Sequence, residues 1–232
     1  MRHGDIPDGS VELVHHGQNH LVIILNERII FRFARYLEGA VILRRTATML
    51  QTLHRRLPLP IPSPLWSWFD LESEPRFPGS AWFGYEALPG SPLWGDVLQG
   101  LAPEHQDRLV ATLVEFLGVL QRIEVATEMA LPQEDVRNWE ALYQELNAGD
   151  FGSSNILWDP KAQRLSGLID FDGIALGNPA IDVAALVASY GEDIVRTHLA
   201  EGKTGGHECA FTGGPLPGKK RCSVFNTAIL RH

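Results

Sequence analysis

Alternating apolar and polar residues predict that the first part of the chain consists mostly of strands. These predicted strands cover residues 11–14, 21–25, 29–34, 65–71 and 81–88. One helix is expected among them, at 37–56, where apolar residues recur at helical spacing. The run Leu57-Pro58-Leu59-Pro60 ends that helix, because proline lacks a backbone donor and restricts the residue before it.

The pattern then changes to helix. A stripe of apolar residues that begins near Pro103 predicts a long helix over 104–126, and a shorter one is expected over 135–146. The pair Asn178-Pro179 resembles a helix start, and the apolar spacing that follows continues a helix toward residue 199.

These patterns predict an α+β fold divided into three parts. Residues 1–88 form an N-terminal lobe of strands plus one helix, and residues 89–200 form a mainly helical C-terminal lobe. Residues 201–232 are rich in glycine and proline and show no periodicity, which predicts a poorly ordered tail. The segment Leu88-Pro89-Gly90-Ser91-Pro92 interrupts both patterns and fits a hinge between the lobes.

The side chains best suited to chemistry flank a predicted hairpin in the second lobe. Two apolar segments and a polar turn lie between Asn155 and Asp170. Folding the hairpin about its midpoint pairs residues whose numbers sum to 325, which places Asn155 opposite Asp170. An amide oxygen and a carboxylate are suitable ligands for Mg²⁺, and Asp150 just outside the hairpin could accept the proton of a hydroxyl group.

Composition narrows the range of partners. The formal net charge of −8 argues against a nucleic-acid-binding surface. Two cysteines make no disulfide framework, which favours a reducing compartment. Neither a signal-peptide pattern nor an apolar run of membrane-spanning length is present in the sequence. We therefore expect a cytoplasmic protein without nucleic-acid or membrane partners.

Several motifs, taken in chain order, resemble the aminoglycoside phosphotransferase family, which has the two-lobe protein-kinase-like fold. Together they span roughly residues 10–200. The matching segments are Gly17-Gln18-Asn19, Phe31-Arg32-Phe33-Ala34-Arg35, Leu57-Pro58-Leu59-Pro60, Gly84-Tyr85-Glu86-Ala87-Leu88-Pro89-Gly90, Gly149 to Trp158, and Gly167 to Leu186.

The resemblance implies transfer of a phosphoryl group from ATP or GTP to a hydroxyl group of a small molecule. Aminoglycosides, macrolides and related amines or sugars are the implied acceptors, and antibiotic resistance is the implied role. On this interpretation Asp150 is the catalytic base, and Asn155 and Asp170 hold Mg²⁺. Asp182 is expected to brace the catalytic loop rather than to react.

The resemblance also implies a nucleotide site in the first lobe. Arg32 takes the place of the cation that pairs with the phosphates, and the turn that contains Gly17 and Gln18 covers them. Residues 84–88, among them Glu86 and Leu88, would bind the base through their backbone.

Some positions depart from the family's pattern. Ala148 stands where the family usually has histidine. Thr46 stands where the first helix usually carries the acid that pairs with the strand cation, so Arg32 is expected to lack an acidic partner. The lead-in to Asp150 is short, and the tail lacks the family's closing helices. These features predict a family member with an internal deletion and an atypical C-terminal tail.

Two other interpretations remain open at this point. The chain could be a catalytically impaired or degenerate kinase-like protein that at most binds nucleotide. Alternatively, an apolar strand that ends in Asp170-Phe171-Asp172-Gly173 resembles the nucleophile motif of haloacid-dehalogenase-like phosphatases. Asp170 would then be the nucleophile and Asp172 the general acid and base.

Overall fold

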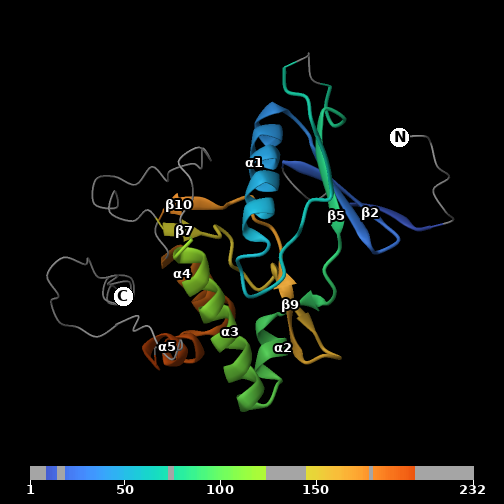
Figure 1. Cartoon of the computed structure of the whole chain (residues 1–232). Helices are drawn as coiled ribbons and strands as arrows, with labels where there is room; N and C mark the ends of the chain where they lie inside the picture. The colour runs from blue at the N-terminus through green and yellow to red at the C-terminus, as the bar shows by residue number, and fades with distance from the viewer. Residues whose placement is uncertain (1–8, 15–18, 73–75, 124–144, 178–179, 202–232) are drawn as a thin grey trace, which may run out of the picture.

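The first lobe is a five-stranded antiparallel sheet with one helix packed on it. A computed structural model describes residues 9–14, 19–72, 76–123, 145–177 and 180–201, which are arranged as two lobes (Figure 1). The strands occur in the spatial order β1-β2-β3-β5-β4. Their bounds are β1 (Val11–Val14), β2 (His20–Leu25), β3 (Ile29–Ala34), β4 (Trp66–Phe69) and β5 (Ala81–Glu86).

The inner face of this sheet is covered by α1 (Leu37–Leu53). Leu43, Leu50 and Leu53 of the helix are fully or almost fully buried, and Phe83 is the fully buried ring of β5. The predicted helix continued to residue 56, but the last three residues form turns that precede the proline-rich segment. The helix therefore buries an apolar stripe and leaves its opposite side to solvent.

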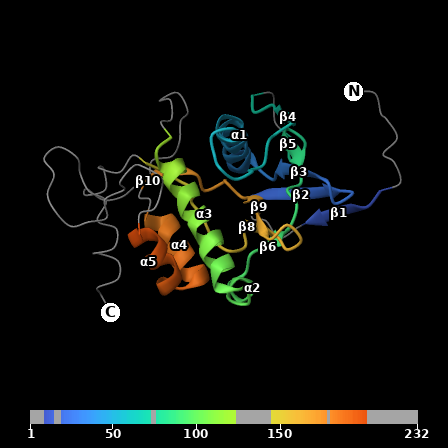
Figure 2. The same cartoon turned by 60° about the horizontal axis from the view of Figure 1, so that its bottom comes forward.

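In the described part of the chain the second lobe contains four helices and two small sheets, one with the strand order β10-β7 and one with the order β6-β8-β9 (Figure 2). The helices are α2 (Gly95–Gln99), α3 (Pro103–Gln121), α4 (Ala180–Tyr190) and α5 (Glu192–Glu201). The strands are β6 (Ser91–Pro92), β7 (Glu145–Asn147), β8 (Ile156–Asp159), β9 (Arg164–Leu168) and β10 (Ala175–Gly177). Figure 2 shows β8 and β9 between the sheet of the first lobe and the helices of the second.

Three further predicted helices differ in the structure. The helix expected over 104–126 is α3, which ends at Gln121; residues 122–123 lie beyond it, and residues 124–126 lie outside the described part of the chain. The helix expected to continue to residue 199 is broken into α4 and α5 at Gly191, whose φ of 93° is a left-handed conformation that suits glycine. The helix expected over 135–146 is wrong at its end, because residues 145–147 form strand β7. β7 pairs with β10, which supplies the hydrogen bonds that a helix would have supplied internally. Residues 135–144 lie outside the described part of the chain.

The register predicted for the hairpin is also wrong. Asp159 pairs with Arg164, so the residue numbers of the pairs nearest the turn sum to 323 instead of 325. Ile156 pairs with Leu168, so the residue numbers of the pairs at the open end sum to 324. A four-residue turn causes the first shift, since the Asp159 carboxylate accepts the N–H groups of Lys161 and Ala162. An irregularity in the ladder between Leu157 and Trp158 causes the second.

Two further expectations concern the C-terminal tail and membrane-spanning helices. The predicted tail lies outside the described residues from residue 202 onward. Among the helices that the structure describes, none has both the length and the apolar character needed to cross a bilayer.

We expect the core of the second lobe to depend on α3. Leu113→Ala should lower the free energy of unfolding by about 2–5 kcal/mol, because Leu113 is fully buried and truncation leaves a cavity. Leu65→Ala is the matched control, since 55% of Leu65 is exposed, and it should cost about 0.5 kcal/mol or less. Denaturant unfolding measures both, and equal costs for the two variants would contradict the described packing.

Candidate functional site

The loop between β7 and β8 carries Asp150. The Asp150 side chain is exposed, whereas the next residue, Phe151, is buried and stacks on Phe116 of α3 with ring centroids 5.7 Å apart. Asn155 closes the loop, because its Nδ2 donates to the backbone carbonyl of Asp150 at 3.1 Å. The loop is therefore fixed on its buried side while its carboxylate faces solvent.

Asp182 of α4 holds the start of this loop. Its Oδ2 accepts the N–H of Ala148 at 2.8 Å, and its Oδ1 accepts the N–H of Gly149 at 3.2 Å. Asp182 is fully buried, so its carboxylate depends on such donors to offset the loss of water. These bonds agree with the predicted bracing role. They also use only the backbone of Ala148, so the brace does not need a histidine side chain there.

A second loop, which follows β9, approaches the first one closely. Gly149 has φ 81°, and a Cβ atom built on it would lie 2.1 Å from the carbonyl oxygen of Gly173. Glycine is therefore required at 149 for two reasons, the left-handed backbone and the contact. The contact fixes the backbone that carries Asp150 against the loop that carries Asp170.

Asn155 and Asp170 lie near one another at the open end of the hairpin. The N–H of Ile169 donates to the carbonyl oxygen of Asn155 at 2.9 Å, so Asn155 lies opposite Ile169 and one residue from the predicted partner. Asp170 has φ 61°, a conformation rare for residues other than glycine and frequent at functional sites. The Asp170 side chain is 47% exposed.

The chemistry of these groups fits a magnesium ion. Burial raises the pKa of Asp170, and the Arg32 charge lowers it only in part. Both candidate ligands are oxygen donors, and Mg²⁺ is usually held by one or two such side chains, with water and phosphate oxygens completing the octahedron. The described residues contain no cluster of three or more His, Cys, Asp or Glu side chains that could hold a metal without a substrate.

Arg32 projects from the inner face of β3 toward this loop. Its Nη2 donates to Oδ2 of Asp172 and lies 3.7 Å from Oδ1 of Asp170. The guanidinium also lies over the Phe83 ring, with Cζ 6.0 Å from the centroid. The expectation that Arg32 lacks an acidic partner is therefore wrong. The partner comes from the loop after β9 instead of from α1.

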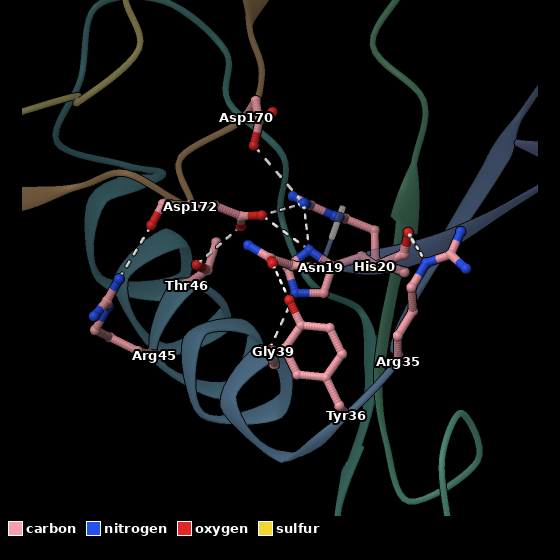
Figure 3. A network of polar contacts seen from close by, with 10 residues as sticks. Asn19, His20, Arg35, Tyr36, Gly39, Arg45, Thr46, Asp170 and Asp172 are labelled. Atoms are coloured by element: carbon pink, nitrogen blue, oxygen red, sulfur yellow. Dashed lines mark hydrogen bonds and ion pairs between the residues drawn. The ribbon is translucent and has the colours of Figure 1, made fainter. Parts of the chain in front are cut away.

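Asp172 is at the centre of a buried polar cluster that the sequence did not reveal (Figure 3). Besides Arg32, its carboxylate accepts the Thr46 hydroxyl at 3.1 Å and lies 3.0 Å from Nδ1 of His20. Burial alone would raise the pKa of Asp172, but the His20 hydrogen bond and the Arg32 charge outweigh it and lower the pKa to about 2. We call His20, Arg32, Thr46 and Asp172 the Asp172 network.

One signal in the sequence could have indicated the network. The polar residues before His20 suggest a turn there, but His20 is the first residue of β2 and pairs with Ala34. Val22 pairs with Arg32, so by the alternation of strand residues His20 and Arg32 lie on the same face. No local pattern predicts that Asp172, which is far away in the sequence, reaches this face.

The remaining predicted nucleotide residues are placed only in part. Glu86 is the exposed last residue of β5, where it pairs with Ile29. Leu88 lies against the hairpin, since a Cβ atom on Gly167 would come within 2.6 Å of its Cδ1. Gly17 and Gln18 lie outside the described residues. The roles of these four residues stay predictions.

A comparison with known families decides the assignment. A family model described as the phosphotransferase enzyme family matches residues 10–148 and 149–215. The chain belongs to this phosphotransferase family. The two matched segments meet between Ala148 and Gly149, where the lead-in to Asp150 was expected to be short.

A curated relative of the family is the viomycin phosphotransferase of Streptomyces vinaceus. It is 31% identical to this chain, in an alignment that takes in 82% of the chain and 77% of the relative. The alignment runs over 231 positions, whereas 82% of this 232-residue chain is a smaller number of residues. The remaining positions of the alignment are filled by the relative alone. The relative therefore has additional residues within the aligned region, and the internal deletion stays a prediction.

Solved structures with the same fold include an aminoglycoside phosphotransferase in complex with GDP and kanamycin. It is 23% identical, with a TM-score of 0.69, and covers 82% of this chain and 76% of its own. A macrolide 2′-phosphotransferase of Brachybacterium faecium is 16% identical, with a TM-score of 0.61 and coverage of 90% and 79%. These similarities show that the family member has the two-lobe kinase-like fold, as predicted.

The fold excludes the phosphatase interpretation. In the described structure β9 pairs antiparallel with β8, whereas the phosphatase motif needs the first strand of a parallel, doubly wound sheet. Asp172, the supposed general acid and base, is turned toward Arg32, His20 and Thr46.

We expect Gly149→Ala to disrupt the site more than backbone strain alone would. Gly191→Ala is the matched control, because Gly191 also has positive φ but a Cβ atom there would meet no other atom within 4 Å, and it should cost about 1 kcal/mol. Gly149→Ala should lower the free energy of unfolding by about 1–3 kcal/mol more, since the Gly173 backbone must move. Thermal or denaturant unfolding measures the difference, and equal losses would argue against the contact.

Proposed function

We propose that the chain transfers the γ-phosphoryl group of ATP or GTP to a hydroxyl group of an antibiotic, with Asp150, Asn155 and Asp170 at the reacting centre. The observation that carries this proposal is the fixed arrangement of two loops. The Asp150 loop is braced by Asp182 and lies in backbone contact with the loop of Asp170. Phosphoryl transfer depends chiefly on positioning and charge neutralisation, which such an arrangement supplies.

Each residue has a separate task in this reaction. The exposed Asp150 carboxylate would orient the acceptor hydroxyl and accept its proton as the oxygen attacks the γ-phosphorus. The bond from that phosphorus to the bridging oxygen breaks, and ADP or GDP leaves. Asn155 and Asp170 would hold Mg²⁺, which neutralises phosphate charge. Arg32 would pair with the phosphates from the first lobe.

The remaining nucleotide contacts come from the first lobe and the linker. Gly17 and Gln18 would cover the phosphates, and the backbone around Glu86 and Leu88 would bind the base. Solved relatives in complex with GDP and with ADP support nucleotide binding by this chain. We also propose the lobes of 1–88 and 89–200 as the working units of the enzyme.

The acceptor is proposed from the relatives. The curated relative acts on viomycin by its name, and relatives with solved structures are named for aminoglycosides and macrolides. Viomycin is the first acceptor to test, because its phosphotransferase shares 31% of aligned residues with this chain. Kanamycin and a macrolide then distinguish the other acceptor classes.

We expect Asp150→Asn to reduce phosphorylation of an accepted antibiotic by at least about 10²-fold, since an amide cannot take the hydroxyl proton. Nucleotide binding should remain, because the proposed nucleotide contacts do not include Asp150. Asp159→Asn is the matched control; an amide oxygen can still accept the turn N–H groups, and activity should stay within about twofold. Mass spectrometry of the antibiotic with either nucleotide provides the measurement.

Undiminished phosphorylation by Asp150→Asn would remove Asp150 from the mechanism. Nucleotide binding by the parent chain without phosphorylation of any acceptor would favour the impaired kinase-like alternative.

We expect Asp170→Asn to raise the Mg²⁺ concentration that half-saturates nucleotide binding by about tenfold or more, because one charged ligand is lost. Thermal stabilisation by ADP or GDP, titrated with Mg²⁺, measures this without an acceptor. Asp150→Asn should leave the same titration unchanged. An identical Mg²⁺ requirement in Asp170→Asn would rule out the proposed ligand.

A further inference from the structure

His20 lies where three elements meet at the boundary between the lobes. It starts β2, is only 3% exposed, and reaches both α1 and the loop after β9 (Figure 3). Its Nε2 lies 3.1 Å from the carbonyl oxygen of Gly39. Because a carbonyl oxygen can only accept, Nε2 carries a proton and anchors the ring to the start of α1.

The other ring nitrogen faces both members of an ion pair. Nδ1 lies 3.0 Å from Nη2 of Arg32 and 3.0 Å from Oδ2 of Asp172. In a neutral ring Nδ1 accepts from Arg32, and in a doubly protonated ring it donates to Asp172. The neutral imidazole therefore binds Arg32 directly, and the doubly protonated imidazole binds Asp172 directly. In each case the remaining member of the pair is held by its ion pair with the first.

The ion pair replaces the strand–helix pair that the family's pattern led us to expect. Thr46, at the helix position of the missing acid, is fully buried and donates its hydroxyl to Oδ1 of Asp172. The helix thus supplies a donor, and the loop after β9 supplies the acid. Arg45 adds a backbone contact, since its Nη2 donates to the carbonyl oxygen of Asp172 at 3.1 Å.

The position of Arg32 matters because a second carboxylate is close. Its Nη2 is 3.7 Å from Oδ1 of Asp170, the proposed metal ligand. If Asp172 were free to turn away, Arg32 would gain by pairing fully with Asp170, since that carboxylate is the next anion within reach. A guanidinium bound to Asp170 would compete with Mg²⁺ for the same oxygens.

We propose that His20 is a positioning residue for phosphoryl transfer, which together with Thr46 keeps Arg32 paired with Asp172 and so leaves Asp170 available to the metal. This inference rests on the proposed function of Arg32 and Asp170. It assigns to His20 and Asp172 the task of holding Arg32 in position. It also explains why a threonine suffices at position 46, since Thr46 binds the acid instead of supplying it.

Two substitutions of His20 separate this role from simple anchoring. The amide of asparagine occupies roughly the place of Nδ1, so His20→Asn can keep the contact with Asp172 and Arg32. The amide of glutamine reaches roughly the place of Nε2, so His20→Gln can keep the bond to Gly39 but loses the contact with the ion pair. The two variants therefore retain opposite halves of the histidine.

We expect His20→Gln to raise both the KM for nucleotide and the Mg²⁺ concentration for half-saturation by about tenfold or more, as loss of an outer-shell partner does at metal sites. His20→Asn should stay within about threefold of the parent for both. The kcat at saturating Mg²⁺ and nucleotide should change less than KM in either variant. Activity assays with an accepted antibiotic, and Mg²⁺ titrations of ADP or GDP binding, provide these values.

A second pair of variants tests the route through Asp172. Thr46→Val removes the hydroxyl donor at nearly constant shape and should shift the Mg²⁺ requirement in the same direction as His20→Gln. In an Asp172→Asn background, His20→Gln should have little further effect, because the group through which it acts is already lost. Additive effects in that background would overturn the proposal.

The outcomes distinguish this proposal from the proposed function. A parent chain that binds neither ADP nor GDP with Mg²⁺ overturns both. A parent that binds nucleotide, with His20→Gln equal to the parent, overturns only the positioning role. If His20→Gln is better than His20→Asn, the positioning role is also overturned, and the anchor to Gly39 is the contact that matters. Thermal unfolding of each variant identifies any that fail to fold, and Thr46→Val then provides the test.

Discussion

The contacts of the Asp172 carboxylate are the interaction on which the arrangement of the site depends. The carboxylate is largely buried, and it contacts polar side chains of β2, β3 and α1, namely His20, Arg32 and Thr46. A buried carboxylate is tolerated only with such partners, so the loop after β9 cannot leave this position cheaply. Because the same loop carries Asp170, the network fixes the position of Asp170 relative to the first lobe.

The second lobe holds its two loops together through their main-chain atoms. The carboxylate of Asp182 accepts two consecutive amides of the Asp150 loop, and Gly149 lies directly against Gly173. The separation between the backbones of the Asp150 and Asp170 loops therefore depends on this main-chain contact and on the Asp182 side chain. The side chain at position 148 takes no part in these contacts, so an alanine there leaves that separation unchanged.

The sequence predicted most of the elements and the members of the site, but not the contacts that hold them. The strands of the first lobe and the long helix α3 follow from strong periodicity, and Asp150, Asn155 and Asp170 follow from motif order. The hairpin register was wrong because it depends on an Asx turn at Asp159 and on one irregularity in the ladder, which a count of residues cannot reveal. The sequence pattern predicts the acid that pairs with Arg32 on α1, at the position of Thr46. Its actual position, 140 residues away at Asp172, is a property of the tertiary fold.

The linker between the lobes limits how they can rotate. On one side the N–H of Ala87 donates to the carbonyl oxygen of Arg28 at 2.7 Å, which anchors Ala87 to the sheet. On the other side Pro89 accepts the Ser166 hydroxyl, and Gly90 lies so close to the Trp158 carbonyl that a Cβ atom would be 2.4 Å from it. The φ torsion of Pro89 is fixed by its ring, so the torsions of Leu88 are the main freedom between two anchored segments. Few free backbone torsions therefore lie between the two anchored segments. Any wide rotation of one lobe on the other must also break the hydrogen bond that the N–H of Leu168 donates to the carbonyl oxygen of Pro60, at 3.0 Å.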